Sequence, residues 1–275
     1  MKRVAFYTLG CKVNQYETES LSGIFEKAGY EIVDFESEAD IYVINTCTVT
    51  SLSDRKSRQI IRRAKKNNEK AIIVVVGCYA QTSPEEVSSI PGVNLVLGTN
   101  GRTGIIDFIN EIEAGKSKLN FVNDIMKVRE FEEMGVEVYK ERTRAFIKIQ
   151  EGCSQFCSYC IIPYARGPVR SREEEKIIEE VKRLSKNGYK EVVLTGIHIA
   201  SYGKDIKTSS LVELIKKVHQ IEGVKRIRLG SIEPRMINES FVDAVAGLNK
   251  LCPHYHVSLQ SGCDSTLSRM NRKYT

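Results

Sequence analysis

The stretch AFIKIQEGCSQFCSYC, residues 145–160, decides how the second half of the chain folds. Its first six residues are mostly apolar and are typical of a buried strand. Three cysteines follow within the next ten residues: Cys153, Cys157 and Cys160. Parallel β/α barrels build their active sites at the C-terminal ends of their strands. We therefore expect a barrel with a metal centre at its mouth.

The spacing C-x3-C-x2-C favours an iron-sulfur cluster over zinc. Three thiolates within eight residues can wrap one face of a cuboidal 4Fe-4S cluster and leave one iron open for a substrate. A structural zinc site needs a fourth Cys or His ligand, and none lies nearby in the sequence. Eight cysteines in a chain without a signal peptide are expected to be reduced thiols, so metal ligation is favoured over disulfides.

The composition is that of a soluble globular protein with room for two domains. The chain has 275 residues, of which 41% are hydrophobic and 28% charged. The longest apolar stretch near the N-terminus, residues 4–9, is too short for a signal peptide or a membrane span. We therefore expect a cytoplasmic protein without a membrane partner.

The net charge of +6 permits nucleic-acid binding without demanding it. Seven basic residues crowd into residues 55–66, a predicted helix with its apolar side at residues 60, 61 and 64. Arg55, Arg58 and Arg62 are candidate RNA contacts on this helix. A solvated helix face explains the same pattern about equally well.

The chain alternates strands and helices in two series, which predicts an α/β protein. Residues 1–115 should form a flavodoxin-like, doubly wound parallel sheet with strands at 4–9, 31–34, 41–46, 71–76 and 94–97. Residues 116–143 are charged and irregular and predict a linker with at most a hairpin. Residues 144–275 should form a partial TIM-like barrel of four βα units, with strands at 145–150, 191–195, 226–230 and 255–259.

Three cysteines of the first series share a structural setting, although they are far apart in sequence. Cys11, Cys47 and Cys78 each stand at the C-terminal end of a predicted strand. In a flavodoxin-like strand order, 2-1-3-4-5, these strands are neighbours, and the crevice above them is where such sheets bind ligands. The three thiols could hold a second cluster, again with one iron open. The alternative is that they are buried cysteines packed as small hydrophobic residues.

Local motifs around both cysteine groups resemble the radical S-adenosylmethionine methylthiotransferase family. They are TLGCKVNQYETE at 8–19, NTCTVT at 45–50, GCYAQ at 77–81 and the 153–160 loop with Tyr159 before its third cysteine. The resemblance implies an auxiliary 4Fe-4S cluster on Cys11, Cys47 and Cys78. It also implies a radical 4Fe-4S cluster on Cys153, Cys157 and Cys160 that binds S-adenosylmethionine.

The residues around Cys11 look most like the bacterial branch that modifies N6-threonylcarbamoyladenosine at position 37, beside the tRNA anticodon. That branch implies two uses of S-adenosylmethionine: methylation of a sulfur at the auxiliary cluster, and formation of a 5'-deoxyadenosyl radical that activates C2 of the adenine. The implied partners are the anticodon stem-loop of tRNA, an electron donor such as flavodoxin or ferredoxin, and an unidentified sulfur donor, but not DNA.

Other functions stay open at this point. Sister branches modify isopentenyladenosine in tRNA or an aspartate of a ribosomal protein. A different radical enzyme that inserts sulfur, or a non-catalytic iron-sulfur protein that binds RNA, would also fit the cysteines. The family continues through further βα units and a C-terminal RNA-binding β-domain, so we expect this chain to be C-terminally truncated.

Polar residues and a glycine at the predicted barrel mouth are candidate contacts for S-adenosylmethionine. They are Tyr159, Thr195, Gly196, Ser231, Glu233 and Gln260. Such residues can equally cap the following helices. Arg166 and Arg170, just past the cysteine loop, are candidates to bind a ligand carboxylate or an RNA phosphate, with surface ion pairs as the alternative.

Overall fold

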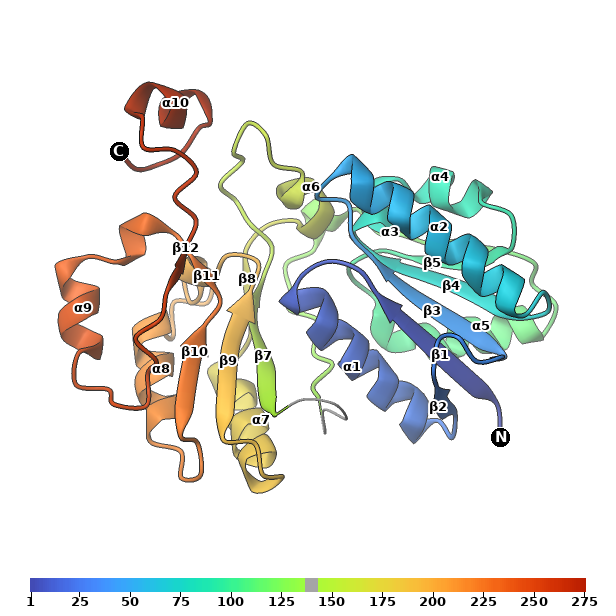
Figure 1. Cartoon of the computed structure of the whole chain (residues 1–275), viewed down its shortest axis with the longest axis horizontal. Helices are drawn as coiled ribbons and strands as arrows, with labels where there is room; N and C mark the ends of the chain where they lie inside the picture. The colour runs from blue at the N-terminus through green and yellow to red at the C-terminus, as the bar shows by residue number, and fades with distance from the viewer. Residues whose placement is uncertain (137–142) are drawn as a thin grey trace. The chain divides into compact units, whose positions relative to one another are not determined.

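The computed structural model describes residues 1–136 and 143–275, which divide into two compact units (Figure 1). The first unit comprises Met1–Val128 and Tyr164–Arg166, and the second comprises Arg129–Pro163 and Gly167–Thr275. The linker predicted at 116–143 is therefore shared between the units, apart from residues 137–142, which lie outside the described residues.

The first unit contains a parallel sheet in the order β2-β1-β3-β4-β5-β6, which confirms the predicted flavodoxin-like order of its first five strands. The strands are β1 (Arg3–Thr8), β2 (Glu31–Val33), β3 (Ile41–Thr46), β4 (Ile72–Gly77), β5 (Val93–Leu97) and β6 (Leu119–Phe121). Strand β6 was not predicted and falls in the expected linker. It has only three residues, two of them exposed, so it leaves no apolar alternation in the sequence.

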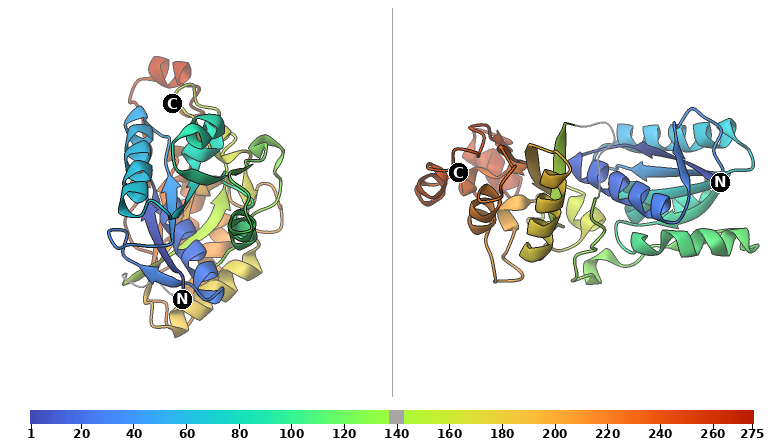
Figure 2. Two further views of the ribbon diagram at one scale, coloured as in Figure 1. Left: turned by 90° about the vertical axis from the view of Figure 1, so that its right-hand side faces the viewer. Right: turned by 90° about the horizontal axis from the view of Figure 1, so that it is seen from below.

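Helices cover both faces of this sheet. Helices α1 (Lys12–Lys27) and α5 (Ile105–Glu113) lie on one face, and α2 (Ser51–Asn67), α3 (Cys78–Thr82) and α4 (Pro84–Ser89) lie on the other (Figures 1 and 2). The apolar stripe of α2 is buried in the core against the central strands, which leaves its basic side facing outward.

The second unit contains the start of a barrel. Strands β7 (Arg144–Glu151), β9 (Glu191–Gly196) and β10 (Arg226–Leu229) are parallel, and the short β8 (Arg170–Ser171) runs antiparallel to β7. Helices α7 (Glu174–Lys186) and α8 (Leu211–His219) pack on these strands.

The fourth predicted barrel strand, 255–259, is reduced to β12 (His256–Val257). It pairs with β11 (Ser231–Ile232) instead of extending the main sheet from β10. The remaining elements are α6 (Ile162–Arg166), α9 (Glu239–Val245), α10 (Asp264–Arg269), η1 (Arg102–Gly104), η2 (Ile125–Lys127), η3 (Ile199–Ser201) and η4 (Pro234–Met236). Across the described parts of the chain, no helix combines the length and the apolar character needed to cross a membrane.

Candidate metal centres

Three adjacent strands of the first unit each deliver one cysteine to the same edge of the sheet. Cys11 caps α1 after β1, Cys47 follows β3, and Cys78 begins α3 after β4. Gly10 sits between two of them: a Cβ added there would lie 3.0 Å from Cys47 Cβ and 3.2 Å from its Sγ. Cys47 and Cys78 are buried and Cys11 is exposed. We call these three cysteines the auxiliary triad.

The side chain of Asn14 ties together the backbone segments that carry Cys11 and Cys47. Its amide nitrogen donates to the carbonyl oxygens of Leu9 (2.7 Å) and Thr46 (2.9 Å). Its Oδ1 accepts a contact from Cys11 Sγ at 3.7 Å. The loops after β1 and β3 are therefore fixed relative to each other by one buried amide.

A buried guanidinium reaches Cys78. Arg166 Nε donates to Cys78 Sγ at 3.2 Å, and Arg166 Nη2 donates to Asn14 Oδ1 at 2.6 Å. The same guanidinium pairs with Glu17, with 2.6 Å between Nη1 and Oε1, and Arg102 pairs with the other oxygen of Glu17 at 2.8 Å. All three charged side chains are 0% exposed. Two guanidiniums and one carboxylate sum to one positive charge, the sign that favours thiolates nearby.

Arg166 and Arg170, the candidates to bind a ligand carboxylate or an RNA phosphate, are both buried. Their exposed fractions are 0% and 1%, and Arg170 Nη1 donates to the carbonyl oxygen of Pro168 at 3.0 Å. A phosphate on the surface does not reach side chains buried to this degree. Arg166 instead binds Glu17, Asn14 and Cys78 inside the first unit.

Burial raises the pKa of Cys78 to about 11, although Arg166 acts in the opposite direction. Burial also raises the pKa of Cys153, in the second unit, to about 11. Both side chains are neutral thiols at pH 7 in the absence of a metal. Each would have to release its proton to become a ligand, so metal binding at both positions is coupled to proton release.

The second group of cysteines, the radical triad, lies on the single loop that follows β7. Cys153, Cys157 and Cys160 are all partly exposed. Gly152 starts the loop with φ of +73°, and a Cβ there would lie 1.9 Å from the carbonyl oxygen of Pro168. Only glycine fits this close backbone passage. The amide of Cys153 donates to the carbonyl of residue 167 at 2.9 Å, which closes the loop.

Arg272, near the end of the chain, contacts the radical triad. Its Nη1 donates to Cys157 Sγ at 3.2 Å, and its Nη2 lies 3.6 Å from Glu233 Oε1. Glu233 is only 4% exposed and also pairs with Arg235 at 3.3 Å. The predicted site residue Glu233 is thus held beside the cysteines. Arg272 was not predicted, because its partner Cys157 lies 115 residues earlier in the chain.

Gln150 is a second residue that sequence reasoning missed. Its Nε2 donates to the carbonyls of Glu151 (2.6 Å) and Gly152 (2.7 Å), and its Oε1 accepts from the amide of His198 at 2.7 Å. It therefore joins the cysteine loop to the loop after β9. Gly196 leaves room for this side chain, since an added Cβ would lie 3.0 Å from Gln150 Oε1.

The other predicted ligand contacts differ in exposure. Thr195 is buried at the end of β9, whereas Tyr159 is 51% exposed on the cysteine loop. Ser231 and Gln260 are exposed, and Gln260 has a φ of +65°. Their contacts with S-adenosylmethionine stay predictions.

The predicted basic helix face is present on α2. Arg55, Arg58 and Arg62 line a surface hollow of about 470 Å³ together with Gln59. Arg58 is tied down, since its Nη1 donates to Tyr79 Oη at 2.8 Å and to Glu86 Oε1 at 3.0 Å. Arg55 and Arg62 are exposed.

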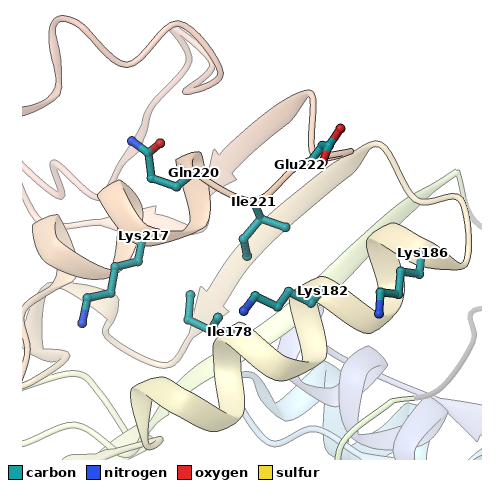
Figure 3. A pocket seen from close by; sticks show the side chains of 7 residues that line it. All are labelled: Ile178, Lys182, Lys186, Lys217, Gln220, Ile221 and Glu222. Carbon is teal, nitrogen blue, oxygen red and sulfur yellow. The ribbon is translucent and has the colours of Figure 1, made fainter.

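The second unit has a larger hollow of about 520 Å³ on its outer helices (Figure 3). Side chains of α7, of α8 and of the segment that follows α8 line it: Ile178, Lys182, Lys186, Lys217, Gln220, Ile221 and Glu222. It contains none of the predicted site residues. We therefore do not assign it to the chemistry of the cysteines.

Each triad offers three cysteine sulfurs, the ligand set with which a 4Fe-4S cluster keeps one iron open. Within residues 1–136 and 143–275, no three His, Cys, Asp or Glu side chains converge closely enough to bind one metal ion. Each triad also has an arginine N–H aimed at one sulfur, a contact that tunes cluster potentials.

Two family models match separate parts of the chain. Residues 3–98 match the model of uncharacterized protein family UPF0004, and residues 147–275 match the radical SAM superfamily. A protein of Bacillus subtilis (strain 168) named threonylcarbamoyladenosine tRNA methylthiotransferase MtaB is 50% identical over 100% of this chain and 61% of its own length. A protein of the same name from Aquifex aeolicus (strain VF5) is 44% identical over 99% of this chain and 66% of its own length.

The chain belongs to the radical S-adenosylmethionine methylthiotransferase family. It spans about two thirds or less of the length of these methylthiotransferase relatives. Among solved structures, the radical S-adenosylmethionine methyltransferase TsrM from Kitasatospora setae matches with a TM-score of 0.68 at 17% identity, covering 100% of this chain and 65% of that one. At that identity the likeness supports the fold alone.

Proposed function

We propose that the protein containing this chain transfers a methylthio group to C2 of N6-threonylcarbamoyladenosine at position 37 of tRNA. The observation that carries the proposal is the presence of two separate three-thiol sets, one at the C-terminal ends of three parallel strands and the other on the loop after the parallel strand β7. Relatives named for this substrate, at 50% and 44% identity, support the choice of nucleoside.

Each triad would hold one 4Fe-4S cluster through three cysteines, which leaves one iron of each for another ligand. When bound, the clusters would supply reductive cleavage of S-adenosylmethionine at one centre and a place for the transferred sulfur at the other. The protein's own residues position and shield these centres. Gly152 and Gln150 shape the radical loop, and Asn14 joins two arms of the auxiliary triad.

Glu233 and Thr195 are the buried polar side chains that we assign to binding S-adenosylmethionine. Glu233 lies 3.6 Å from Arg272, which donates to Cys157, so its carboxylate is fixed next to the radical triad. A fixed acceptor suits the hydroxyl groups of a ribose. The exposed Tyr159, Ser231 and Gln260 would complete the site, and Gly196 would act indirectly by making room for Gln150.

The RNA would approach the first unit along α2. Arg55 and Arg62 present exposed guanidiniums at one hollow, a geometry suited to phosphates of an anticodon stem-loop. Arg58 would act through its bond to Tyr79, the residue after Cys78. We place the protein in the cytoplasm with its tRNA, an electron donor such as flavodoxin or ferredoxin, and a sulfur donor.

Two measurements test this function. In a strain that lacks the gene, mass spectrometry of tRNA nucleosides should show loss of the 2-methylthio form of N6-threonylcarbamoyladenosine, while the form on isopentenyladenosine is retained. The reverse pattern would reassign the substrate, and unchanged nucleosides would refute the proposal. After anaerobic reconstitution, the chain should bind about eight irons, two cubanes' worth, and form 5'-deoxyadenosine under reducing conditions.

A further inference from the structure

The residue that stands out beyond the cysteines is Arg166. The residues on either side of Tyr164–Arg166 in the chain belong to the second unit, yet this short segment belongs to the first. Its anchoring is specific: Thr99 Oγ1 donates to the carbonyl oxygen of Ala165 at 2.8 Å. Arg166 comes only six residues after Cys160 of the radical triad, yet its side chain is placed against the auxiliary triad.

The contacts of Arg166 resemble those of a residue that holds a metal ligand in place. Its Nε–H points at the sulfur of Cys78, and its two other nitrogens are occupied by Asn14 and Glu17. Glu17 is itself held by Arg102. A guanidinium fixed at three points cannot swing away, so its hydrogen bond to Cys78 is kept when that sulfur carries a negative charge.

We propose that Arg166 is a positioning residue of the auxiliary centre, which fixes the Cys78 sulfur and raises the reduction potential of the cluster bound there. This inference rests on the proposed assignment of a cluster to Cys11, Cys47 and Cys78. An N–H donor and a positive charge beside a ligand sulfur stabilise the reduced, more negative cluster. Loss of both therefore makes reduction harder and lowers the potential.

The test uses this chain with Cys153, Cys157 and Cys160 all replaced by Ala, so that only the auxiliary centre can hold iron. The protein is reconstituted anaerobically, its iron is counted, and its midpoint potential is measured by titration with dithionite monitored by electron paramagnetic resonance. Arg166→Gln should shift the oxidised-to-reduced ratio at a fixed potential at least tenfold toward the oxidised form. For a one-electron couple this corresponds to about 59 mV.

Arg102→Gln is the matched control, because Arg102 is equally buried and pairs with the same carboxylate of Glu17. It should disturb folding as much as Arg166→Gln but shift the potential by less than half as much. The shift in potential for Arg166→Lys, which keeps the charge without the planar fork, should lie between the shifts for Arg102→Gln and Arg166→Gln. Equal shifts in Arg166→Gln and Arg102→Gln, or no shift, would overturn the role of Arg166.

Folding is checked by circular dichroism, since Arg166→Gln leaves Glu17 with one partner fewer. Should that variant not fold, Arg166→Lys keeps a cation beside Glu17, and a lowered potential, smaller than the shift predicted for Arg166→Gln, is expected from it. A background protein that binds no iron would refute the cluster assignment, and the inference with it. Normal iron content and an unchanged potential in Arg166→Gln would refute the role of Arg166 but leave the cluster assignment in place.

Discussion

Both triads bring three cysteine thiols together, but different structural elements position them. The auxiliary triad is assembled from the ends of three strands, with successive cysteines 36 and 31 positions apart in the sequence, and two of its thiols are buried. The radical triad lies within eight residues of one loop, and its three thiols are partly exposed. A sheet edge therefore positions the first, whereas loop geometry positions the second.

The arginines beside the two triads also differ in how deeply they are buried and how closely they are paired. Arg166 is 0% exposed and bound to a carboxylate that is also 0% exposed, with 2.6 Å between Nη1 and Oε1. Arg272 is 8% exposed and lies 3.6 Å from Glu233. The auxiliary triad is built into the core of its unit, while the radical triad stays accessible on one side. We infer that disruption of the first affects folding as well as metal binding, and that disruption of the second affects chiefly metal binding.

The largest effects should come from the cysteines themselves. Cys157→Ala should reduce 5'-deoxyadenosine formation to background and lower the iron content by about four per chain, because a cubane needs its thiolates. Cys47→Ala should also lose about four irons but keep cleavage of S-adenosylmethionine. Cys263→Ser, at an exposed cysteine outside both triads, is the control and should keep all the iron. If Cys47→Ala abolished cleavage as completely as Cys157→Ala, the two centres would not be independent.

The next largest effects should come from two buried carboxylates, Glu17 beside the auxiliary triad and Glu233 beside the radical triad. Glu17→Gln leaves two fully buried guanidiniums without their anion and should lower the free energy of unfolding by about 3–5 kcal/mol. Glu233→Gln should cost only about 1 kcal/mol, because Arg235 is 45% exposed and the pairs are long. Urea unfolding of the metal-free chain, followed by circular dichroism, measures both. Equal losses of unfolding free energy in Glu17→Gln and Glu233→Gln would show that Arg166 and Arg272 are embedded to the same degree.

Glycine substitutions should give a smaller but local effect on the radical triad. Gly152→Ala combines a strained positive φ with an overlap on the carbonyl of Pro168 and should cost about 3 kcal/mol. Gly188→Ala has a similar φ of +97° but open space around the new Cβ, so it should cost about 1 kcal/mol. Only the first should release iron from the radical centre, as measured by iron content after reconstitution. Retained iron in Gly152→Ala would mean that the loop tolerates a shift of its first residue.

The sequence was sufficient for the order of the first five strands and for the position of six cysteines just after strands, because hydrophobic runs and local motifs carry that information. It was not sufficient for the residues that hold the triads in place. Glu17 and Arg166 are 149 residues apart, and Arg272 and Cys157 are 115 apart. Such pairs leave no periodic pattern, so Arg166 resembled a surface cation until the structure showed its burial. The short strands β6 and β12 were missed or overestimated because two or three residues give too little pattern.

The smallest expected effect concerns RNA and distinguishes the basic surfaces of the two units. Arg55→Glu with Arg62→Glu should weaken tRNA binding and reduce the slope of log affinity against log salt concentration by about 2, one for each lost phosphate contact. The matched control is Lys182→Glu with Lys186→Glu in the hollow of the second unit, which makes the same change of charge. Filter binding at several salt concentrations measures both. An equal loss of slope in the two double variants would indicate attraction by net charge alone, whereas a loss confined to the α2 variant would assign the RNA contact to the unit that carries the auxiliary triad.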